Sequence, residues 1–495
     1  MANRISTELL IMILKNVQSS HSTQDLYSSL FVNRIWCKVT IPILWELPFG
    51  QETVFYEKKA LCIRTYLSCM DTQARNILIQ NGLDLSSSPP QTTFDYPSFT
   101  HKFIINNLVY FISIYSRKII RSYPVDNEGI LFREIFKLIN KRCKFMISFK
   151  ITGVPIKFSQ ELLNYSDLIG SILKLPSASK VFKKLKSFTS KIIYNEQIRP
   201  LYESLALICD NILNMDLLLN SYSQVKLVAK LISVQKRLEN LSINYSQDCN
   251  SLLWAIIGQK ETLKRLRLYS VNFCQFERKS SPIGQFISLQ ELSICKCSGL
   301  RNSNCLFLAS SFTHLNSFHY THSFYVKTAY PQEFIIKILE AANTNLKNIY
   351  LDLYSAITLE IFSTILNYCT RITELSLYYL SSEQVIAIFN NNINELRRFS
   401  FDCGKGFDVN ELLCQMAKNV PESLETIEFR MYHAWIFNAN SLRKFFEGWC
   451  CKGRGRNKMI IVKRTPARLF RLSDEHYKVI EEYGVQFAIE EQYSK

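Results

Sequence analysis

Hydrophobic residues recur along this chain in a fixed arrangement, L-x-x-L-x-L, in which the polar residues fall between the apolar ones. Clear copies begin at Leu238, Leu263, Leu289, Leu346, Ile372, Leu396 and Leu424, and weaker copies begin at Leu185, Ile212 and Leu315. Successive copies start 24 to 31 residues apart, most often 26. Because apolar residues at alternate positions share one face of an extended segment, each copy predicts a short strand with one buried face.

The segments between these copies have helical spacing instead. Apolar residues follow the 3.6-residue period in 332–345, in 359–369 and in 409–420. Each segment predicts a return helix that leads from one strand to the next. Strand and helix therefore alternate with a period of about 26 residues.

A period between 20 and 29 residues with this apolar spacing is typical of leucine-rich repeats, in which neighbouring repeats bury each other's apolar faces. We expect an α/β fold, a solenoid of parallel strands with return helices. Cys209 and Cys369 stand three residues before the first apolar position of their repeats, which resembles the cysteine-containing subclass. Solenoids present long surfaces that mostly bind other molecules.

Four regions are predicted. They are a small all-α module at 1–50, a linker and helical cap at 51–140, the repeats at 141–440, and a C-terminal cap with a basic loop and an acidic tail at 441–495. An uncharged, largely apolar stretch, 103–116, has 14 residues and includes two Asn, which is below the ~18 residues of a membrane span. We expect it to be a buried helix.

The first fifty residues do not share the repeat. Residues 8–17 place Leu9, Ile13 and Val17 on one helical face with Leu10 and Leu14 beside them. Ser6 or Thr7 is the expected N-cap. A polar break leads to a second predicted helix that contains Asp25 in its first turn, reaches Trp36 and ends at Pro42.

This region resembles the F-box family over about 40 residues. The pattern of that family is matched by Glu8, Leu9, Leu10, Ile13, Leu14, Asp25, Leu26, Val32, Arg34, Trp36 and Val39. Ile5 and Ser6 depart from the Leu-Pro that opens the family's pattern. With the repeats that follow, the whole chain looks like fungal-type F-box and leucine-rich-repeat proteins.

The resemblance implies a substrate receptor of a ubiquitin ligase. The helical module would bind a Skp-type adaptor, which joins a cullin and RING scaffold, and the repeats would hold a protein substrate. Adaptor contact is expected from Leu9, Leu10, Ile13, Leu14, Leu26, Val32 and Trp36. Two alternatives stay open: these residues form the core of a cap on the solenoid, or the chain is a protein-binding scaffold that works without ubiquitin.

Alternation in each strand sends the polar residues between the leucines to the opposite, concave face of the sheet. We call these polar residues of the concave face the lane. Because Arg and Tyr are frequent interface anchors, substrate contact on the lane is expected from Arg265, Arg267, Tyr269, Tyr350, Tyr378, Arg398 and Arg430. The Arg residues favour an acidic or phosphorylated segment. Alternatively, Glu291, Glu374 and Glu428 neutralise them. These interleaved carboxylates disfavour nucleic acid on the lane.

The formal charge of +17 is unevenly placed. Residues 101–200 contain 18 Lys and Arg against 6 Asp and Glu, and a second basic zone runs from Arg443 to Arg471 with a loop at 452–458. Such zones are either well-solvated surface or contacts for phosphates and carboxylates. Nucleic-acid binding, the least favoured function, would use them and would weaken steeply with salt.

The sequence predicts no enzyme, no cofactor and no membrane partner. It lacks metalloprotease, serine-hydrolase and phosphate-loop motifs, and its 14 Gly are few. Its 15 Cys form no C-x-x-C pair and follow no secretory leader, which favours a cytoplasmic or nuclear protein. One group of possible metal ligands, His314, His319 and His322 with Cys295, Cys297 and Cys305, is not expected to bind metal.

Overall fold

The structure is a computed structural model of the 495-residue chain. It describes residues 5–19, 23–50, 56–85, 92–118, 128–152, 169–191, 199–246, 250–274, 286–300, 312–323, 330–391, 393–403, 408–431, 437–450, 457–464 and 472–491. Two compact units, residues 1–238 and 239–495, divide the chain. Each unit is described by itself below.

Three short helices open the first unit: α1 (Thr7–Ser19), α2 (Thr23–Ser29) and α3 (Arg34–Leu44). Leu10, Leu14, Leu26 and Ile43 form their buried core, and Trp36 packs against it. The single helix predicted after residue 25 is wrong. The Asn33 side chain accepts hydrogen bonds from the backbone N–H groups of residues 35 and 36 at 2.9 and 3.0 Å, which starts a separate helix α3. That helix also continues through Pro42.

The rest of the first unit alternates helices with four parallel strands in the described residues. In chain order these elements are α4 (Tyr56–Ser68), α5 (Thr72–Gln80), η1 (Tyr96–Phe99), β1 (Lys102–Ile104), α6 (Ile105–Lys118), α7 (Glu128–Arg142), β2 (Ser148–Thr152), α9 (Pro176–Phe182), β3 (Ser187–Lys191), α10 (Arg199–Ile208), β4 (Asn214–Leu218) and α11 (Tyr222–Ser233). The uncharged stretch 103–116 lies mostly in the buried helix α6, as predicted.

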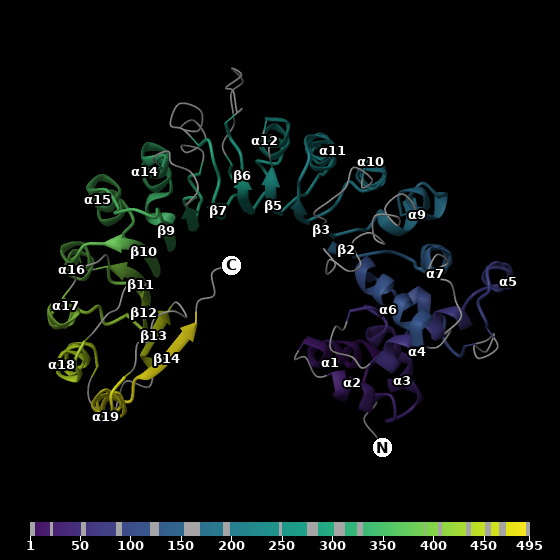
Figure 1. Ribbon diagram of the computed structural model, residues 1–495, viewed down its shortest axis with the longest axis horizontal. Helices are drawn as coiled ribbons and strands as arrows, with labels where there is room; N and C mark the ends of the chain where they lie inside the picture. The colour runs from purple at the N-terminus through teal and green to yellow at the C-terminus, as the bar shows by residue number, and fades with distance from the viewer. Residues whose placement is uncertain are drawn as a thin grey trace. The chain divides into compact units, whose positions relative to one another are not determined.

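The second unit continues the alternation with ten parallel strands among its described residues. In chain order they and their helices are β5 (Asn240–Ser246), α12 (Asn250–Ile257), β6 (Arg265–Val271), β7 (Glu291–Cys295), β8 (Ser317–Thr321), α14 (Gln332–Ala342), η5 (Asn343–Asn345), β9 (Asn348–Asp352), α15 (Leu359–Tyr368), β10 (Glu374–Leu380), α16 (Ser382–Asn390), β11 (Arg398–Cys403), α17 (Val409–Met416), β12 (Thr426–Met431), α18 (Ala439–Trp449), β13 (Met459–Arg464), α19 (Asp474–Tyr483) and β14 (Gln486–Glu491). In Figure 1 the helices from α14 to α18 lie along one side of these strands.

This architecture confirms the predicted α/β fold with parallel strands and return helices. The strands start two residues after the predicted repeat starts, as at Arg265 after Leu263 and Arg398 after Leu396. Equivalent positions pair across neighbouring strands, for example Arg265 with Glu291. The strands also extend beyond the predicted 141–440 range, since β1 precedes it and both β13 and β14 follow it.

A backbone hydrogen-bond pattern repeats at the strand starts. The carbonyl of Glu239 accepts the N–H groups of Lys264 and Arg265 at 2.8 and 2.9 Å, and the same arrangement recurs in later repeats. In the first unit the carbonyl of Glu46, which follows α3, accepts the N–H groups of His101 and Lys102 at 3.1 and 2.9 Å. The segment after the three-helix module therefore accepts the N–H groups at the start of β1, as the preceding repeat does for the later strands.

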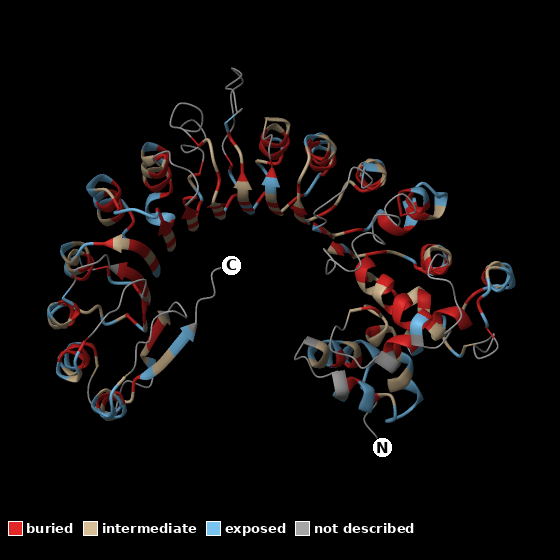
Figure 2. Cartoon of the chain, in the orientation of Figure 1, coloured by how far each residue is buried: buried red, intermediate tan, exposed pale blue. Residues whose placement is uncertain are grey.

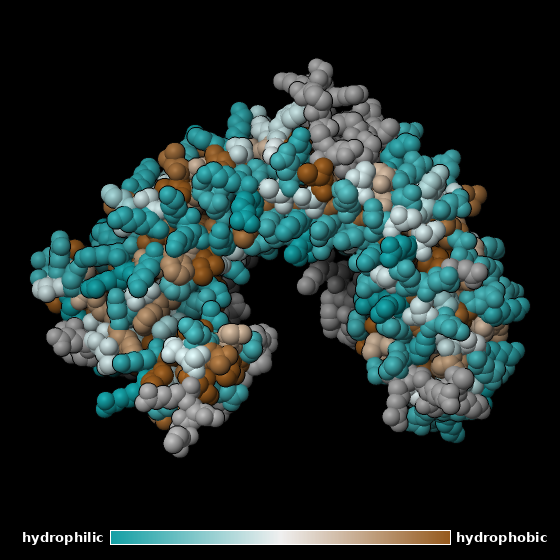
Figure 3. Space-filling view, turned by 180° about the vertical axis from the view of Figure 1, so that it is seen from behind, coloured by the Kyte–Doolittle hydropathy of each residue, from teal (hydrophilic) through white to brown (hydrophobic). Residues whose placement is uncertain are grey.

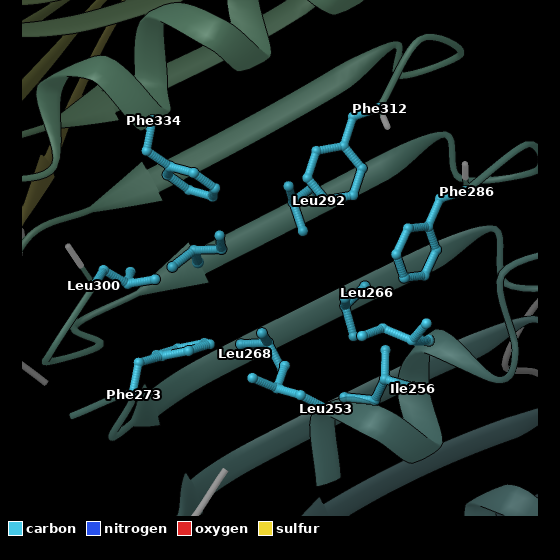
Figure 4. A pocket seen from close by; sticks show the side chains of 12 residues that line it. Leu253, Ile256, Leu266, Leu268, Phe273, Phe286, Leu292, Leu300, Phe312 and Phe334 are labelled. Carbon is cyan, nitrogen blue, oxygen red and sulfur yellow. The ribbon is translucent and has the colours of Figure 1, made fainter. Parts of the chain in front are cut away.

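The core of the second unit lies between the strands and their helices, where the repeated apolar residues are buried (Figure 2). A cavity of about 30 Å³ remains among twelve apolar side chains, including Leu266, Phe273, Phe286 and Phe312 (Figure 4). All twelve of these described side chains are apolar, so they offer no hydrogen-bond partner to a polar ligand or to water. The cavity is therefore a packing defect of the core rather than a ligand pocket.

Candidate functional site

The three-helix module exposes an unusual amount of apolar side chain. Of the twenty large hydrophobic residues that are exposed among the described residues, eight lie between residues 5 and 35: Ile5, Leu9, Met12, Ile13, Tyr27, Phe31, Val32 and Ile35. Phe31 is the most exposed, at 87%. Hydrophobic side chains gather over the N-terminal helices, at the lower left of Figure 3. We call these eight residues the apolar face.

The residues predicted to face an adaptor divide into two groups. Leu9, Ile13 and Val32 belong to the apolar face, whereas Leu10, Leu14 and Leu26 are buried in the core of the module itself. Trp36 is half-buried and packs on that core. A buried side chain is not available to a docking protein. The expectation that Leu10, Leu14 and Leu26 contact an adaptor is therefore corrected: they form the core of the module. The apolar face also contains Ile5, Met12, Tyr27, Phe31 and Ile35, which the sequence analysis did not select. Helical spacing from Leu9 could have indicated Met12 on α1, whereas Phe31 lies in the turn between α2 and α3.

On the second unit, the open face of the sheet carries a network of charged side chains centred on Glu428 of β12. The Glu428 side chain is only 1% exposed and contacts three cations: Arg398 at 2.8 Å, Arg430 at 2.6 Å and Lys463 at 3.0 Å. Lys463 also lies 3.6 Å from Glu490. We call Arg398, Glu428, Arg430, Lys463 and Glu490 the charged network. A buried carboxylate is stable here because several charged donors surround it.

Arg430 connects this network to two tyrosines on β9 and β10. Its guanidinium donates a hydrogen bond to the Tyr350 hydroxyl at 3.1 Å and lies 4.6 Å from the centre of the Tyr378 ring. The Tyr378 hydroxyl also donates to that of Tyr350, at 3.0 Å. Small residues allow this long reach, because Ser376 and Ser400 occupy the intervening strands at the level of Tyr350 and Glu428.

His319 of β8 extends the cluster. Its ring lies 3.9 Å from that of Tyr350, and its Nε2 is 3.1 Å from the Thr321 hydroxyl. Burial, together with the positive charges of Arg430 and Arg267, lowers the pKa of His319 to about 4. The imidazole is therefore neutral near pH 7. Burial also raises the pKa of Tyr350 and that of the nearby Asp352 carboxyl.

The predicted substrate residues thus occupy one sheet face but differ in availability. Tyr378 and Arg430 are buried, and Tyr350 and Arg398 are half-buried within the cluster. Arg265 and Arg267 are exposed on β6. Arg267 lies 3.9 Å from Glu291, and Arg265 has no ion pair among the described residues.

Tyr269 follows these arginines on β6 and is half-buried. Its ring packs against that of Tyr245 at 6.0 Å and lies 5.4 Å from the Lys296 ammonium. A hydrogen bond to Tyr269 is the main reason that the pKa of Lys296 is raised. The arginine and tyrosine side chains of β6 are therefore the part of the predicted lane that a partner can reach most easily.

Two of the possible metal ligands, His319 and His322, lie on β8 and directly after it. In the portion of the chain that is described, no group of three or more His, Cys, Asp and Glu is placed to hold a metal ion. Cys305 lies outside the described residues, and His322 bonds to the Tyr320 hydroxyl at 3.3 Å. A search of the described helices finds none with the length and apolarity to cross a membrane.

The predicted basic loop is only partly described. Residues 452–456 lie outside the described residues, whereas Lys458 donates to the carbonyl of Glu422 at 3.1 Å and to that of Leu424. Its ammonium also lies 5.6 Å from the Trp449 ring, and burial lowers its pKa. Lys458 therefore holds α18 against the loop that precedes β12.

Comparison with protein-family models gives no match to this chain, and comparison with curated proteins gives no similar sequence. Function is therefore inferred below from the residues and their geometry.

Proposed function

We propose that the chain is the substrate-recognition subunit of a Skp-cullin-F-box ubiquitin ligase. In this proposal the three-helix module binds a Skp-type adaptor through its apolar face, and the open sheet face of the second unit binds a protein substrate. The observation that carries it is the apolar face, which lies within the segment that resembles an F-box.

The division of the apolar residues of α1 into a buried group and an exposed group supports this assignment. On α1, Leu10 and Leu14 form the module's core, so Leu9, Met12 and Ile13 are not needed to fold it. Leu9, Met12 and Ile13 share one face of α1, and exposed apolar residues that gather on one face often mark a protein-interaction site. The departure at Ile5 and Ser6 does not remove the helix start, because the Ser6 hydroxyl accepts a hydrogen bond from the N–H of Leu9 at 3.3 Å.

The substrate side of the proposal rests on the lane. Arg and Tyr are the residues that most often anchor protein interfaces, and β6 presents Arg265, Arg267 and Tyr269 together. An acidic or phosphorylated segment would pair with these arginines. The charged network of β11 to β14 would then shape the surface rather than contact the segment, because its cations already have Glu428 as a partner.

Co-expression with a Skp-type adaptor tests the adaptor side. The doubly substituted Ile13→Asp, Val32→Asp chain should lose the adaptor in size-exclusion chromatography and keep its thermal melting temperature, because both side chains are exposed. Leu14→Asp is the matched control, since it places a charge in the module's core and should lower the stability as well. Adaptor retained by the double variant, or by a chain lacking residues 1–50, would refute the proposal.

A protein-binding scaffold that works without ubiquitin is the second candidate. The departure of Ile5 and Ser6 from the family's pattern favours it. It predicts that the wild-type chain fails to bind the adaptor, while substitution of Arg265 and Arg267 still weakens capture of a protein partner.

A further inference from the structure

A lysine-rich part of the first unit contains no acidic residue of its own. The described residues 143–152 and 169–191 contain eight Lys and no Asp, Glu, Arg, Tyr or Trp. Five of these lysines lie where α9 ends and where the chain enters β2 and β3: Lys144, Lys180, Lys183, Lys184 and Lys186. We call these five the lysine rim.

Backbone hydrogen bonds bring the two strand-entry loops side by side. The carbonyl of Ile147 accepts the N–H groups of Lys186 and Ser187 at 2.9 and 3.0 Å, and the N–H of Met146 donates to the carbonyl of Val181 at 2.8 Å. Lysines from consecutive repeats therefore share one edge of the sheet. Like charges at this proximity repel each other and create a region of positive potential.

An aromatic pair supports one of these lysines. The Lys184 ammonium lies 5.2 Å from the Phe145 ring, whose other neighbour is the His101 ring, stacked at 4.3 Å with an angle of 5° between the planes. The Phe145 ring is held by its stacking on His101, and its cation–π contact with the Lys184 ammonium in turn restricts that side chain. Of the rim, Lys144, Lys180, Lys183 and Lys184 are exposed and Lys186 is half-buried.

Three carboxylates of the first unit are paired with cations that do not belong to the rim. Asp216 pairs with Lys191 at 2.6 Å, Asp210 pairs with Lys236 at 2.5 Å, and Asp95 lies 4.0 Å from an Arg142 nitrogen. No ion pair to a lysine of the rim is found among the described residues. Positive charge that the described residues do not neutralise is available to an external anion.

We propose that the lysine rim binds the phosphate backbone of a nucleic acid. Phosphate contacts dominate nucleic-acid affinity, and lysines supply them as point charges. A protein partner would instead need the Arg, Tyr or Trp anchors of an interface, and the described residues 143–152 and 169–191 contain none. The site differs from the lane, where carboxylates interleave. It goes beyond the proposed function and does not depend on it.

Binding of the full chain to a fluorescently labelled 20-base-pair DNA duplex, followed by anisotropy at several salt concentrations, tests this site. Five phosphate contacts predict that log affinity falls against log salt with a slope of about −4.5. The doubly substituted Lys183→Gln, Lys184→Gln chain should show a slope that is shallower by about two. No binding at low salt, or a slope near zero, would overturn the proposal.

A matched control removes two exposed lysines elsewhere in the same unit, with Lys226→Gln and Lys230→Gln on α11. This control should keep the wild-type slope, whereas an equal loss in both variants would mean that only net charge matters and the rim is not a site. Poly-glutamate is the competing probe. If it binds the rim as tightly as the duplex, the assignment to nucleic acid is wrong and the site belongs to acidic proteins. Melting temperatures verify that both variants are folded.

Discussion

Two regions of this protein differ in whether their positive side chains are paired with carboxylates. In the charged network of the second unit, Arg398, Arg430 and Lys463 converge on one buried carboxylate, Glu428. In the lysine rim of the first unit, the cations have no carboxylate partner among the described residues. Both regions lie on parallel strands and their entry loops, so the fold does not dictate the difference.

The comparison shows why charge counts from the sequence do not identify a binding site. An arginine whose charge is neutralised inside the protein contributes to stability, whereas an unpaired lysine is only solvated and contributes to the external potential. The network should therefore affect folding, and the rim should affect association. Substitutions in the two regions should separate these two roles.

The largest effect is expected from Glu428→Gln. The substitution keeps the side-chain shape but leaves buried Arg430 without its carboxylate, and such unpaired buried charge typically costs about 3–5 kcal/mol. Urea denaturation should show this loss in the free energy of unfolding of the second unit. Glu291→Gln, which alters the exposed pair with Arg267 at 3.9 Å, is the control and should cost less than about 1 kcal/mol. Equal effects would contradict the comparison.

The lowered pKa of His319 should make the free energy of unfolding depend on pH. Its folded-state pKa is about 4, against about 6.5 in an unfolded chain. The unfolded chain binds a proton first, so the stability contributed by neutral His319 is lost as the pH falls from about 6.5 to 4, by up to about 3 kcal/mol. His319→Gln should flatten the stability curve in this window. An unchanged curve would show that His319 is not held neutral.

Tyr350→Phe should have a smaller effect. It removes the hydroxyl that accepts hydrogen bonds from Arg430 and Tyr378, and loss of such an acceptor costs about 1–2 kcal/mol. Thermal melting of this variant should lie between wild type and Glu428→Gln. A melting temperature equal to that of wild type would mean that Arg430 is held by Glu428 alone.

The smallest effect on stability is expected in the lysine rim. Lys183→Gln with Lys184→Gln removes two exposed charges that have no carboxylate partner in the described structure, so the free energy of unfolding should change by less than about 0.5 kcal/mol. Relief of like-charge repulsion would even raise it slightly. A loss comparable to that of Glu428→Gln would show that the rim is structural, and the distinction between the two regions would fail.

The repeat architecture was predictable because Leu positions such as Leu266 and Leu268 fix the strand register. The first strands escaped prediction, since Phe149 and Ile151 of β2 replace the leucines. Placement of Arg398 and Arg430 on one face followed from alternation. Their shared ion pair with Glu428 could not be predicted. Alternation along a strand places side chains on a face but does not show how far each side chain extends.

The sequence also could not distinguish the core residues of the three-helix module from its surface residues. Leu9 and Leu10 are adjacent and equally apolar, yet one is 55% exposed and the other 1%. Only the packing of α1 against α2 and α3 separates them. The lysine rim was visible only as an excess of charge, because the sequence does not show which lysines have acidic neighbours.

The most direct test of the comparison measures the salt dependence of duplex DNA binding for two variants that each remove two cations. One is Lys183→Gln with Lys184→Gln in the rim, and the other is Arg398→Gln with Lys463→Gln in the charged network. The account predicts a slope shallower by about two for the rim variant and a wild-type slope for the network variant. A wild-type slope for the rim variant, with a shallower slope for the network variant, would contradict it.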